Sequence, residues 1–200
     1  PLVVLGTYLL WFGWFGVTGL SQLAMGTFDD VNALTTMAVN THLAGAAGTV
    51  VGAALTRLIG GKTDIVMMLY GALAGLVAIT AEPLTPDPLL AMLIGAIGAV
   101  IMYFGTKFLE SQKIDDVVGA IPVHMFAGIF GTLVVPMSNP DTNFGSQLLG
   151  VISVCVFSFI LSYIVFKALK ETIGLRISKE AEKLGTDKAE VGVVAYSIRD

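Results

Sequence analysis

The chain has 200 residues with a mean hydropathy of +0.83, and only 13% of them are charged, with 11 Lys and Arg against 15 Asp and Glu. So few charges cannot cover the surface of a soluble globular domain, and 55% hydrophobic residues also exclude a disordered chain. The net charge of −4 gives nucleic-acid binding no electrostatic support, and a single cysteine excludes a disulfide framework and a cysteine metal cluster.

A membrane protein remains, and its predicted elements are six nearly uncharged stretches. A helix needs about 20 apolar residues to cross a hydrocarbon core of about 30 Å, and the two shortest stretches reach that length with their neutral or snorkelling flanks. The stretches are continuously apolar and do not alternate, which favours helices over a β-barrel. We therefore expect an all-α membrane protein with six transmembrane helices. The stretches are 1–28, 31–56, 65–81, 89–106, 117–140 and 142–166.

The loops between the stretches give an orientation, because basic residues favour the cytoplasmic side of a membrane. Turn signals lie at Asp29-Asp30, Gly60-Gly61-Lys62, Pro83–Pro88, Gln112–Asp116 and Ser138–Asn143. Every basic residue flanks the second or fourth of these turns or follows the last stretch. We therefore expect both ends in the cytoplasm, with a transmembrane domain over 1–177 and a cytoplasmic tail over 178–200. No charged segment precedes the first stretch, so we expect no cleaved signal peptide and a further part of the protein before residue 1.

Small residues at helical spacing predict close packing, because helices in lipid associate through small side chains. The second stretch has Ala44, Gly48 and Gly52 at steps of four. Similar pairs elsewhere are Gly71 with Gly75 and Gly128 with Gly131. A narrow pore that passes between the backbones is the alternative interpretation, and the spacing alone does not decide between the two.

Two histidines lie inside apolar stretches. An ionisable group inside a membrane is costly, so His124 in the fifth stretch is a candidate functional residue. Its neighbours at helical spacing are small and apolar, which would place the ring beside a narrow, dry space. A hydrogen bond to a neighbouring helix is the alternative for His124, and an ordinary polar contact between helices is the preferred interpretation of His42.

Other polar and aromatic residues suggest weaker hypotheses. Trp14 and Ser21, about two turns apart, could hold a small cation through cation–π attraction, but composition alone favours an aromatic belt at the membrane interface. Thr80 is expected to bond back to its own helix. Asp115 and Asp116 are interpreted as a negative first turn that stabilises a helix N-terminus, and not as a catalytic pair.

Several segments occur together in a specific order. They are Trp11-Phe12-Gly13-Trp14-Phe15-Gly16 followed by Ser21, Val39-Asn40-Thr41, Ala74–Thr80, Ile114-Asp115-Asp116, Val123-His124 and Ile173-Gly174-Leu175-Arg176. In order and spacing they closely resemble the ammonium transporter (Amt/Rh) family, over all 200 residues. The resemblance implies the second half of an eleven-helix inverted-repeat fold, namely helices six to eleven and the cytoplasmic tail. It also implies a homotrimer in the prokaryotic inner membrane, with one pore in each subunit and no cofactor.

The resemblance further implies roles for four residues. In the family, an ammonium ion is recruited at an outer site, loses its proton and passes as ammonia along two stacked histidines in a hydrophobic channel. Ser21 matches the outer-site serine, and His124 matches the second histidine. Trp14 matches the tryptophan that lines the pore beside the histidines, deeper than the cation site considered above, and Thr80 matches a threonine near the pore. The first histidine and the other outer-site aromatic residues would belong to helices that precede this sequence.

Several positions depart from the family pattern. Val17 stands where the family has one of two gating phenylalanines, and Gly119 stands where it has an aspartate associated with function. The other departures are Thr18, Leu20, Met125 and, in the tail segment 190–196 that resembles the family's ending, Val191. The changes at Val17 and Gly119 lie within the expected conduction path and therefore bear on whether the protein conducts.

Three hypotheses follow. The first is a conducting ammonium transporter. The second is an ammonium sensor or receptor that binds the ion without ordinary conduction and signals through the segment after Leu175. The third is a structural partner in the trimer with no ligand. Expected partners are ammonium or ammonia, the lipid bilayer and, on the cytoplasmic side, a PII-type regulator or a fused signalling domain; no phosphate loop, metal cluster or nucleophile arrangement indicates an enzyme.

Overall fold

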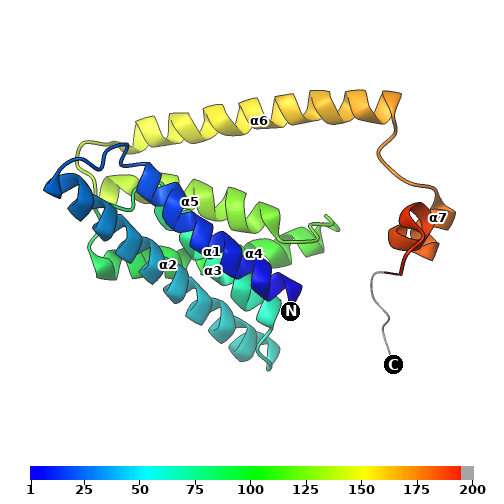
Figure 1. Cartoon of the computed structure of the whole chain (residues 1–200), viewed down its shortest axis with the longest axis horizontal. Coiled ribbons are helices and arrows are strands. Elements are labelled where there is room, and N and C mark those ends of the chain that lie inside the picture. Colours follow the sequence, from blue (N-terminus) through cyan, green and yellow to red (C-terminus); the bar gives the residue numbers. More distant parts are fainter. Residues whose placement is uncertain (195–200) are drawn as a thin grey trace. The chain divides into compact units, whose positions relative to one another are not determined.

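The computed structural model describes residues 1–194, which form helices joined by turns and loops and contain no β-strand. They belong to two compact units, Pro1–Val151 and the part from Ile152 onward, which we describe separately. Figure 1 shows the helices coloured in chain order. Each of the six apolar stretches contains a helical region, so the predicted all-α fold is confirmed. Residues 195–200 of the expected cytoplasmic tail lie outside the described residues.

The first two helices are α1 (Leu2–Leu20) and α2 (Phe28–Gly60). Thr27 begins α2 with a capping box, in which its hydroxyl accepts the Asp30 amide hydrogen while the Asp30 carboxylate accepts that of Thr27. Gly61, at φ 75°, ends α2 in the left-handed conformation that glycine adopts without strain. The acidic pair expected as a turn is therefore the first turn of the helix, where negative charge is favourable. The 33 residues of α2 make it about 50 Å long, beyond the expected 31–56.

The next two helices are α3 (Ile65–Thr80) and α4 (Pro88–Ser111). Asp64 caps α3 by accepting two amide hydrogens of the first turn, and Asp87 caps α4 by accepting one. Pro88 follows directly at the first position of α4, where its missing amide hydrogen costs nothing. The predicted turn Pro83–Pro88 therefore contains the aspartate that caps α4, and Asp64 follows the predicted turn Gly60-Gly61-Lys62 by two residues.

The fifth apolar stretch is not the single continuous helix that we expected over 117–140. It divides into the π-helical η1 (Ile121–Phe126), the α-helical α5 (Ala127–Val134) and the 3₁₀ turn η2 (Val135–Met137). Pro136 lies in the 3₁₀ turn and cannot donate the backbone hydrogen bond that would continue the α-helix. Pro122 lies at the start of η1, where the missing amide hydrogen costs nothing. Single π-helical turns are frequent at functional sites, and this one contains His124.

The remaining helices are α6 (Phe144–Thr172), which runs on into the second unit, α7 (Lys179–Leu184) and η3 (Asp187–Val191). No residue of α6 is buried, although its most apolar window has a mean hydropathy of 2.5. A helix that is apolar all round and unburied is typical of a segment surrounded by lipid. In the tail, Ser178 caps α7, and Glu182 of that helix accepts a hydrogen bond from Nε of Arg176 at 2.9 Å.

Four helices within the described residues are long and apolar enough to cross a membrane, namely α1, α2, α4 and α6. The helix α3 and the region Ile121–Met137 are apolar but shorter than the about 20 residues that a straight crossing needs. Length and composition therefore support four of the six predicted spans, and the count of six stays a prediction.

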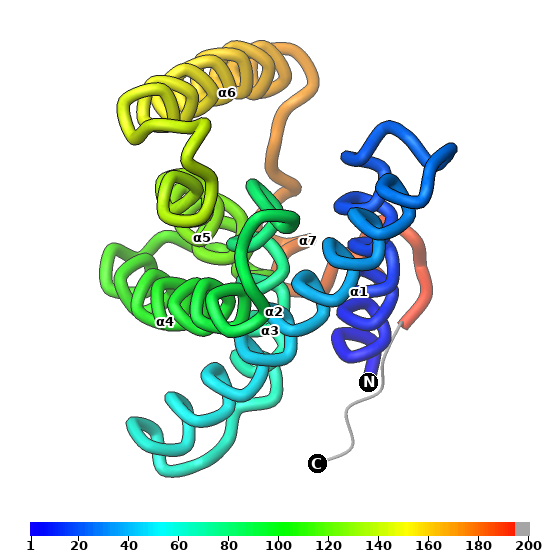
Figure 2. Tube along the Cα trace, turned by 90° about the vertical axis from the view of Figure 1, so that its left-hand side faces the viewer, coloured from blue at the N-terminus to red at the C-terminus, as the bar shows by residue number. Residues whose placement is uncertain are grey.

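Glycines bring α2, α3 and α4 into backbone contact, and Figure 2 shows these helices side by side. A Cβ atom added to Gly48 would meet the backbone carbonyl of Gly71, and one added to Gly75 would meet that of Ala44. The same holds for Gly131 of α5 against Ala78. The prediction of close packing through small residues is confirmed at these positions, and the packing brings α3 to the centre of the first unit.

Candidate functional site

Trp14, in the C-terminal half of α1, meets Thr80, the last residue of α3. The indole Nε1–H of Trp14 donates a hydrogen bond to Oγ1 of Thr80 at 2.7 Å. Thr80 in turn donates to the carbonyl of Leu76 at 2.6 Å, so the expected bond to its own helix is present. A hydroxyl has one hydrogen and two lone pairs, so Thr80 acts as the acceptor for the indole. The edge of the Trp14 ring is thereby fixed and its face is free to stack.

His124 occupies that face. The Trp14 and His124 rings lie with centroids 6.3 Å apart and planes inclined by 22°, which is a stacked arrangement. The histidine is contributed by η1, while the buried Pro122 and Val123 anchor the same turn in the bundle. His124 itself is exposed on the surface of the chain as described. The three residues Trp14, Thr80 and His124 come from three separate helices, and together we call them the Trp14 cluster.

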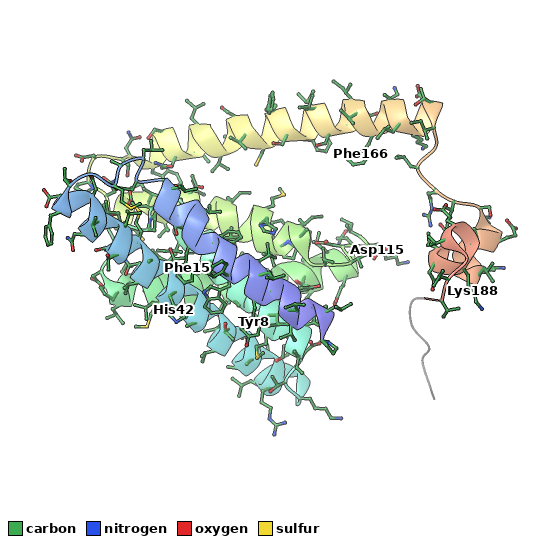
Figure 3. All side chains as sticks on the ribbon, in the orientation of Figure 1. Tyr8, Phe15, His42, Asp115, Phe166 and Lys188 are labelled. Carbon is green, nitrogen blue, oxygen red and sulfur yellow. The ribbon has the colours of Figure 1, made fainter. Side chains whose placement is uncertain are left out.

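Asp116 fixes the start of the turn that carries His124. Its two carboxylate oxygens accept the amide hydrogens of Ala120 and Ile121 at 2.9 and 2.8 Å. The predicted helix N-terminal role is therefore present for Asp116. Asp115 is exposed at the surface and carries no such cap, and Figure 3 shows it at the tip of the preceding loop.

Gly119 lies between Asp116 and His124 in a left-handed conformation, with φ 65°. It is buried against Tyr70 of α3, and an added Cβ would lie 2.6 Å from the ring atom Cε2. The Tyr70 hydroxyl is 3.4 Å from the carbonyl of Val117. An aromatic ring thus fills the place beside the position where the family pattern has an aspartate.

Ser21 and Val17 lie apart from the Trp14 cluster. Ser21 follows the last residue of α1, is exposed, and donates its hydroxyl to the Val17 carbonyl at 3.0 Å. At 1.5 Å per residue it lies about 10 Å along the helix from Trp14. Val17 is 51% exposed, so its side chain closes no gate within the described residues. Trp14 and Ser21 are therefore too far apart along α1 to form the two-residue cation site in direct contact with each other.

Sequence reasoning missed a second aromatic group. His42 of α2 contacts the rings of Trp11 and Phe15 of α1, with centroids 5.5 and 6.3 Å apart. Figure 3 shows Phe15 and His42 on the two helices where these pass one another. The interpretation of His42 as a contact between helices holds in its location, but the contacts that the structure gives it are ring contacts. The indole nitrogen of Trp11 is buried and has no hydrogen-bond partner among the described residues.

Within residues 1–194, no group of three His, Cys, Asp or Glu side chains lies close enough together to hold a metal ion. The chemistry that the Trp14 cluster offers is an aromatic face, a lone pair of a threonine hydroxyl and an imidazole. Such a set can contact a small polar guest without a metal or a nucleophile.

Four helices that are long and apolar enough to cross a membrane, together with close packing through glycines, define a multi-pass α-helical membrane protein. Three of its helical elements bring Trp14, Thr80 and His124 together. The chain belongs to the Ammonium Transporter Family, whose family model matches residues 1–196. This match covers the whole of the described chain and confirms the family inferred from the sequence.

Named relatives and solved structures agree with this membership. Ammonium transporter Amt2 of Archaeoglobus fulgidus is 38% identical over 213 residues, which cover 96% of this chain and 45% of that protein. A solved structure named Sensor Amt Protein has a TM-score of 0.84 at 34% identity, over 94% of this chain and 48% of the other. Candida albicans Mep2 has a TM-score of 0.80 at 27% identity, over 94% of this chain and 45% of the other.

The chain therefore spans about half the length of the curated relatives that it matches. These relatives are named as ammonium transporters and not as enzymes. Both parts of the earlier functional hypothesis, transporter and sensor, have a counterpart among the similar proteins.

Proposed function

We propose that the complete protein binds ammonium from the outer side of the cell membrane and conducts ammonia through a pore lined by the Trp14 cluster. The observation that carries this proposal is the stacking of Trp14 on His124 while Thr80 holds the indole edge. Hydrogen bonds within the cluster leave the imidazole available for a guest. An apolar wall with one such polar group suits a small neutral molecule better than an ion.

The proposed fold of the complete protein is the eleven-helix inverted repeat, of which this chain supplies helices six to eleven. In this arrangement the shorter α3 and the region Ile121–Met137 also cross the membrane, beside the four long helices. Residues 1–177 form the membrane domain, and the tail from residue 178 lies in the cytoplasm with the basic residues. The preceding helices would complete the pore and supply the first of the two histidines.

Conduction follows from the cost of charge in an apolar pore. Ser21, exposed at the end of α1, takes part in recruiting ammonium at the outer mouth, and Val17 lies one turn further in. An unpaired cation in a dry channel is strongly unfavourable, so ammonium gives up its proton to water at the outer mouth and continues as ammonia. His124 then exchanges a hydrogen bond with the passing ammonia while Trp14 shields it from water. Asp116 acts indirectly, by fixing the turn that presents His124.

The proposed assembly is a homotrimer in the prokaryotic inner membrane, with one pore in each subunit. The fully unburied and apolar α6 supports an environment of lipid or other helices around it. On the cytoplasmic side, a PII-type regulator or a fused signalling domain is the proposed partner of the tail.

A sensor that binds ammonium without ordinary conduction is the second candidate. Two observations favour it: a structure named Sensor Amt Protein resembles this chain with a TM-score of 0.84, and the conduction path departs from the family pattern at Val17 and Gly119. The same binding cavity would then report ammonium to a cytoplasmic domain.

One experiment separates these functions. The complete protein is reconstituted in liposomes, and an inward ammonium gradient is applied while the internal pH and the current are recorded. A conducting pore gives a signal that His124→Ala changes at least threefold, whereas His42→Ala, the matched histidine outside the Trp14 cluster, leaves it unchanged. Thermal stabilisation by millimolar ammonium without flux selects the sensor, because any ligand that binds only the folded state raises its stability. A protein that shows no flux and is not stabilised by ammonium would contradict both functions.

A further inference from the structure

Two adjacent residues of α2, Asn40 and Thr41, make polar contacts that the proposed pore does not use. Their exposed fractions are 1% and 0%. A polar side chain buried between apolar helices is costly unless it is hydrogen-bonded, so its partners indicate what it fixes in place. The partners of these two residues belong to α1 and to the connection between α3 and α4.

Thr41 reaches α1 through Thr18. Its Oγ1 donates to Oγ1 of Thr18 at 3.2 Å, and Thr18 donates to the backbone carbonyl of Trp14 at 3.0 Å. Because each hydroxyl has one hydrogen, the two bonds run in one direction, from α2 to α1. Thr18 is 1% exposed, so no solvent competes for this chain of bonds. The turn of α1 that carries Trp14 is thereby tied to α2.

Asn40 reaches the connection between α3 and α4. Its side-chain amide donates both hydrogens, to the carbonyls of Pro83 and Pro86 at 2.9 and 2.8 Å. Pro83 follows Thr80, close after the end of α3. The side-chain oxygen of Asn40 has no partner among the described residues, so the two donated bonds alone orient the amide. The end of α3 that carries Thr80 is thereby tied to α2 as well.

We propose that Asn40 and Thr41 are positioning residues for the hydrogen bond between Trp14 and Thr80. The two residues are adjacent on one rigid helix. Thr41 holds Trp14 through Thr18 and the Trp14 backbone carbonyl, and Asn40 holds the end of α3 with Thr80 through the connection that follows it. Neither residue contacts ammonium. The inference rests on the proposed role of Trp14 and Thr80 in the pore wall, and it adds the reason why their 2.7 Å bond is maintained.

The bond itself is followed in the complete protein in lipid bilayers, through the solid-state nitrogen NMR resonance of the isotope-labelled Trp14 indole. Thr80→Val defines the shift produced when the acceptor is lost. Thr41→Val is expected to move the same resonance in the same direction, and Thr41→Ser, which keeps the hydroxyl, to restore it. Thr49→Val is the matched control, because Thr49 lies on the same helix and, among the residues that the structure describes, its hydroxyl bonds only to the carbonyl of Gly45. An unmoved Trp14 resonance in Thr41→Val overturns the proposal.

Asn40 is tested in the same way. Asn40→Leu keeps the approximate shape of the side chain and removes both donors, and it is expected to shift the Trp14 resonance as Thr80→Val does. If this variant does not assemble, Asn40→Ser, which is smaller, takes its place with the same expected shift. An unchanged resonance in the assembled variant overturns the role of Asn40.

Flux supplies a second readout. Thr41→Val is expected to lower the maximum ammonium flux about threefold to tenfold at an unchanged half-saturating concentration, and to add less than about twofold in a Thr80→Val background. If Thr41 had only a general structural role, the flux losses of the two single variants would multiply in the double variant. That outcome would contradict the proposal. If the protein carries no flux, the proposed conduction fails while the NMR comparison still decides the positioning role, so the two failures are distinguishable.

Discussion

Tyr70 of α3 fills the space beside Gly119, so that a Cβ on this glycine would lie 2.6 Å from the tyrosine ring. The glycine has a positive φ of 65° and begins the turn that leads to His124. Two independent features, the left-handed backbone and the packed ring, therefore favour glycine here. The packing of Tyr70 of α3 against the turn therefore favours glycine at a position where the family pattern has an aspartate.

Restoring the family's aspartate at this position should therefore be harmful. Gly119→Asp is expected to destabilise the protein by about 1–3 kcal/mol, because the added side chain overpacks against Tyr70 and the left-handed conformation is strained. Thermal unfolding in detergent measures the loss. The double variant Gly119→Asp with Tyr70→Ala should recover part of it, and a Gly119→Asp protein as stable as the original would contradict the packing argument.

Removing the acceptor of the Trp14 indole should weaken the site. In Thr80→Val the indole hydrogen is left without a partner in a partly buried place, which costs about 1–3 kcal/mol, whereas Thr80→Ser keeps the acceptor. We expect a lower melting temperature and reduced ammonium flux for the valine variant only. Thr132→Val in α5 is the control, because within residues 1–194 the Thr132 hydroxyl bonds only to the carbonyl of Gly128. Equal losses for the Val and Ser variants would show that the hydroxyl is not the cause.

The two neighbouring aspartates should differ sharply. Asp116→Ala removes the cap that holds Ala120 and Ile121, with an expected cost of about 0.5–2 kcal/mol and a reduced flux because the turn of His124 loosens. Asp115→Ala changes only an exposed carboxylate and should leave stability and flux unaltered. Melting temperature and flux are measured on both variants. Similar effects of the two substitutions would argue against the capping role.

The glycine contacts between helices should tolerate no side chain. Gly48→Ala places a methyl group against the Gly71 carbonyl, and we expect a loss of about 1–3 kcal/mol or failure to assemble. Gly6→Ala in α1 is the matched control, because nothing lies within 4 Å of its added Cβ. The control should gain up to about 1 kcal/mol from helix propensity. Comparing the melting temperatures and the yield of assembled protein checks both outcomes.

Much of the helical framework could be predicted from the sequence, because apolar length and turn chemistry are local properties. The cap at Asp87 lies within the predicted turn Pro83–Pro88, and the cap at Asp64 lies two residues after the predicted turn Gly60-Gly61-Lys62. The start of α2 was predicted too late, because Asp29-Asp30 was interpreted as a loop although acidic residues also favour a first helical turn. The π-helical winding of Ile121–Phe126 and the 3₁₀ turn Val135–Met137 were missed, because a run of apolar residues has the same periodicity whether or not its hydrogen bonds shift.

The candidate site was less accessible from the residues alone. His124 stood out because an imidazole within an apolar stretch is expensive. Its pairing with Trp14 was available only from the family resemblance, since no spacing rule brings positions 110 residues apart together. The contacts of Asn40 with two proline carbonyls were not predictable at all, because they depend on how a loop folds over a neighbouring helix.

The π-helical turn at Ile121–Phe126 makes the site sensitive to chain length as well as to side-chain chemistry. Such a turn is equivalent to one extra residue inserted into an α-helix. Deleting a single amino acid there would let the backbone relax to ordinary α-helical winding and swing the imidazole around the helix by about 100°. The ring would then leave the indole without any change in the residues that form the site.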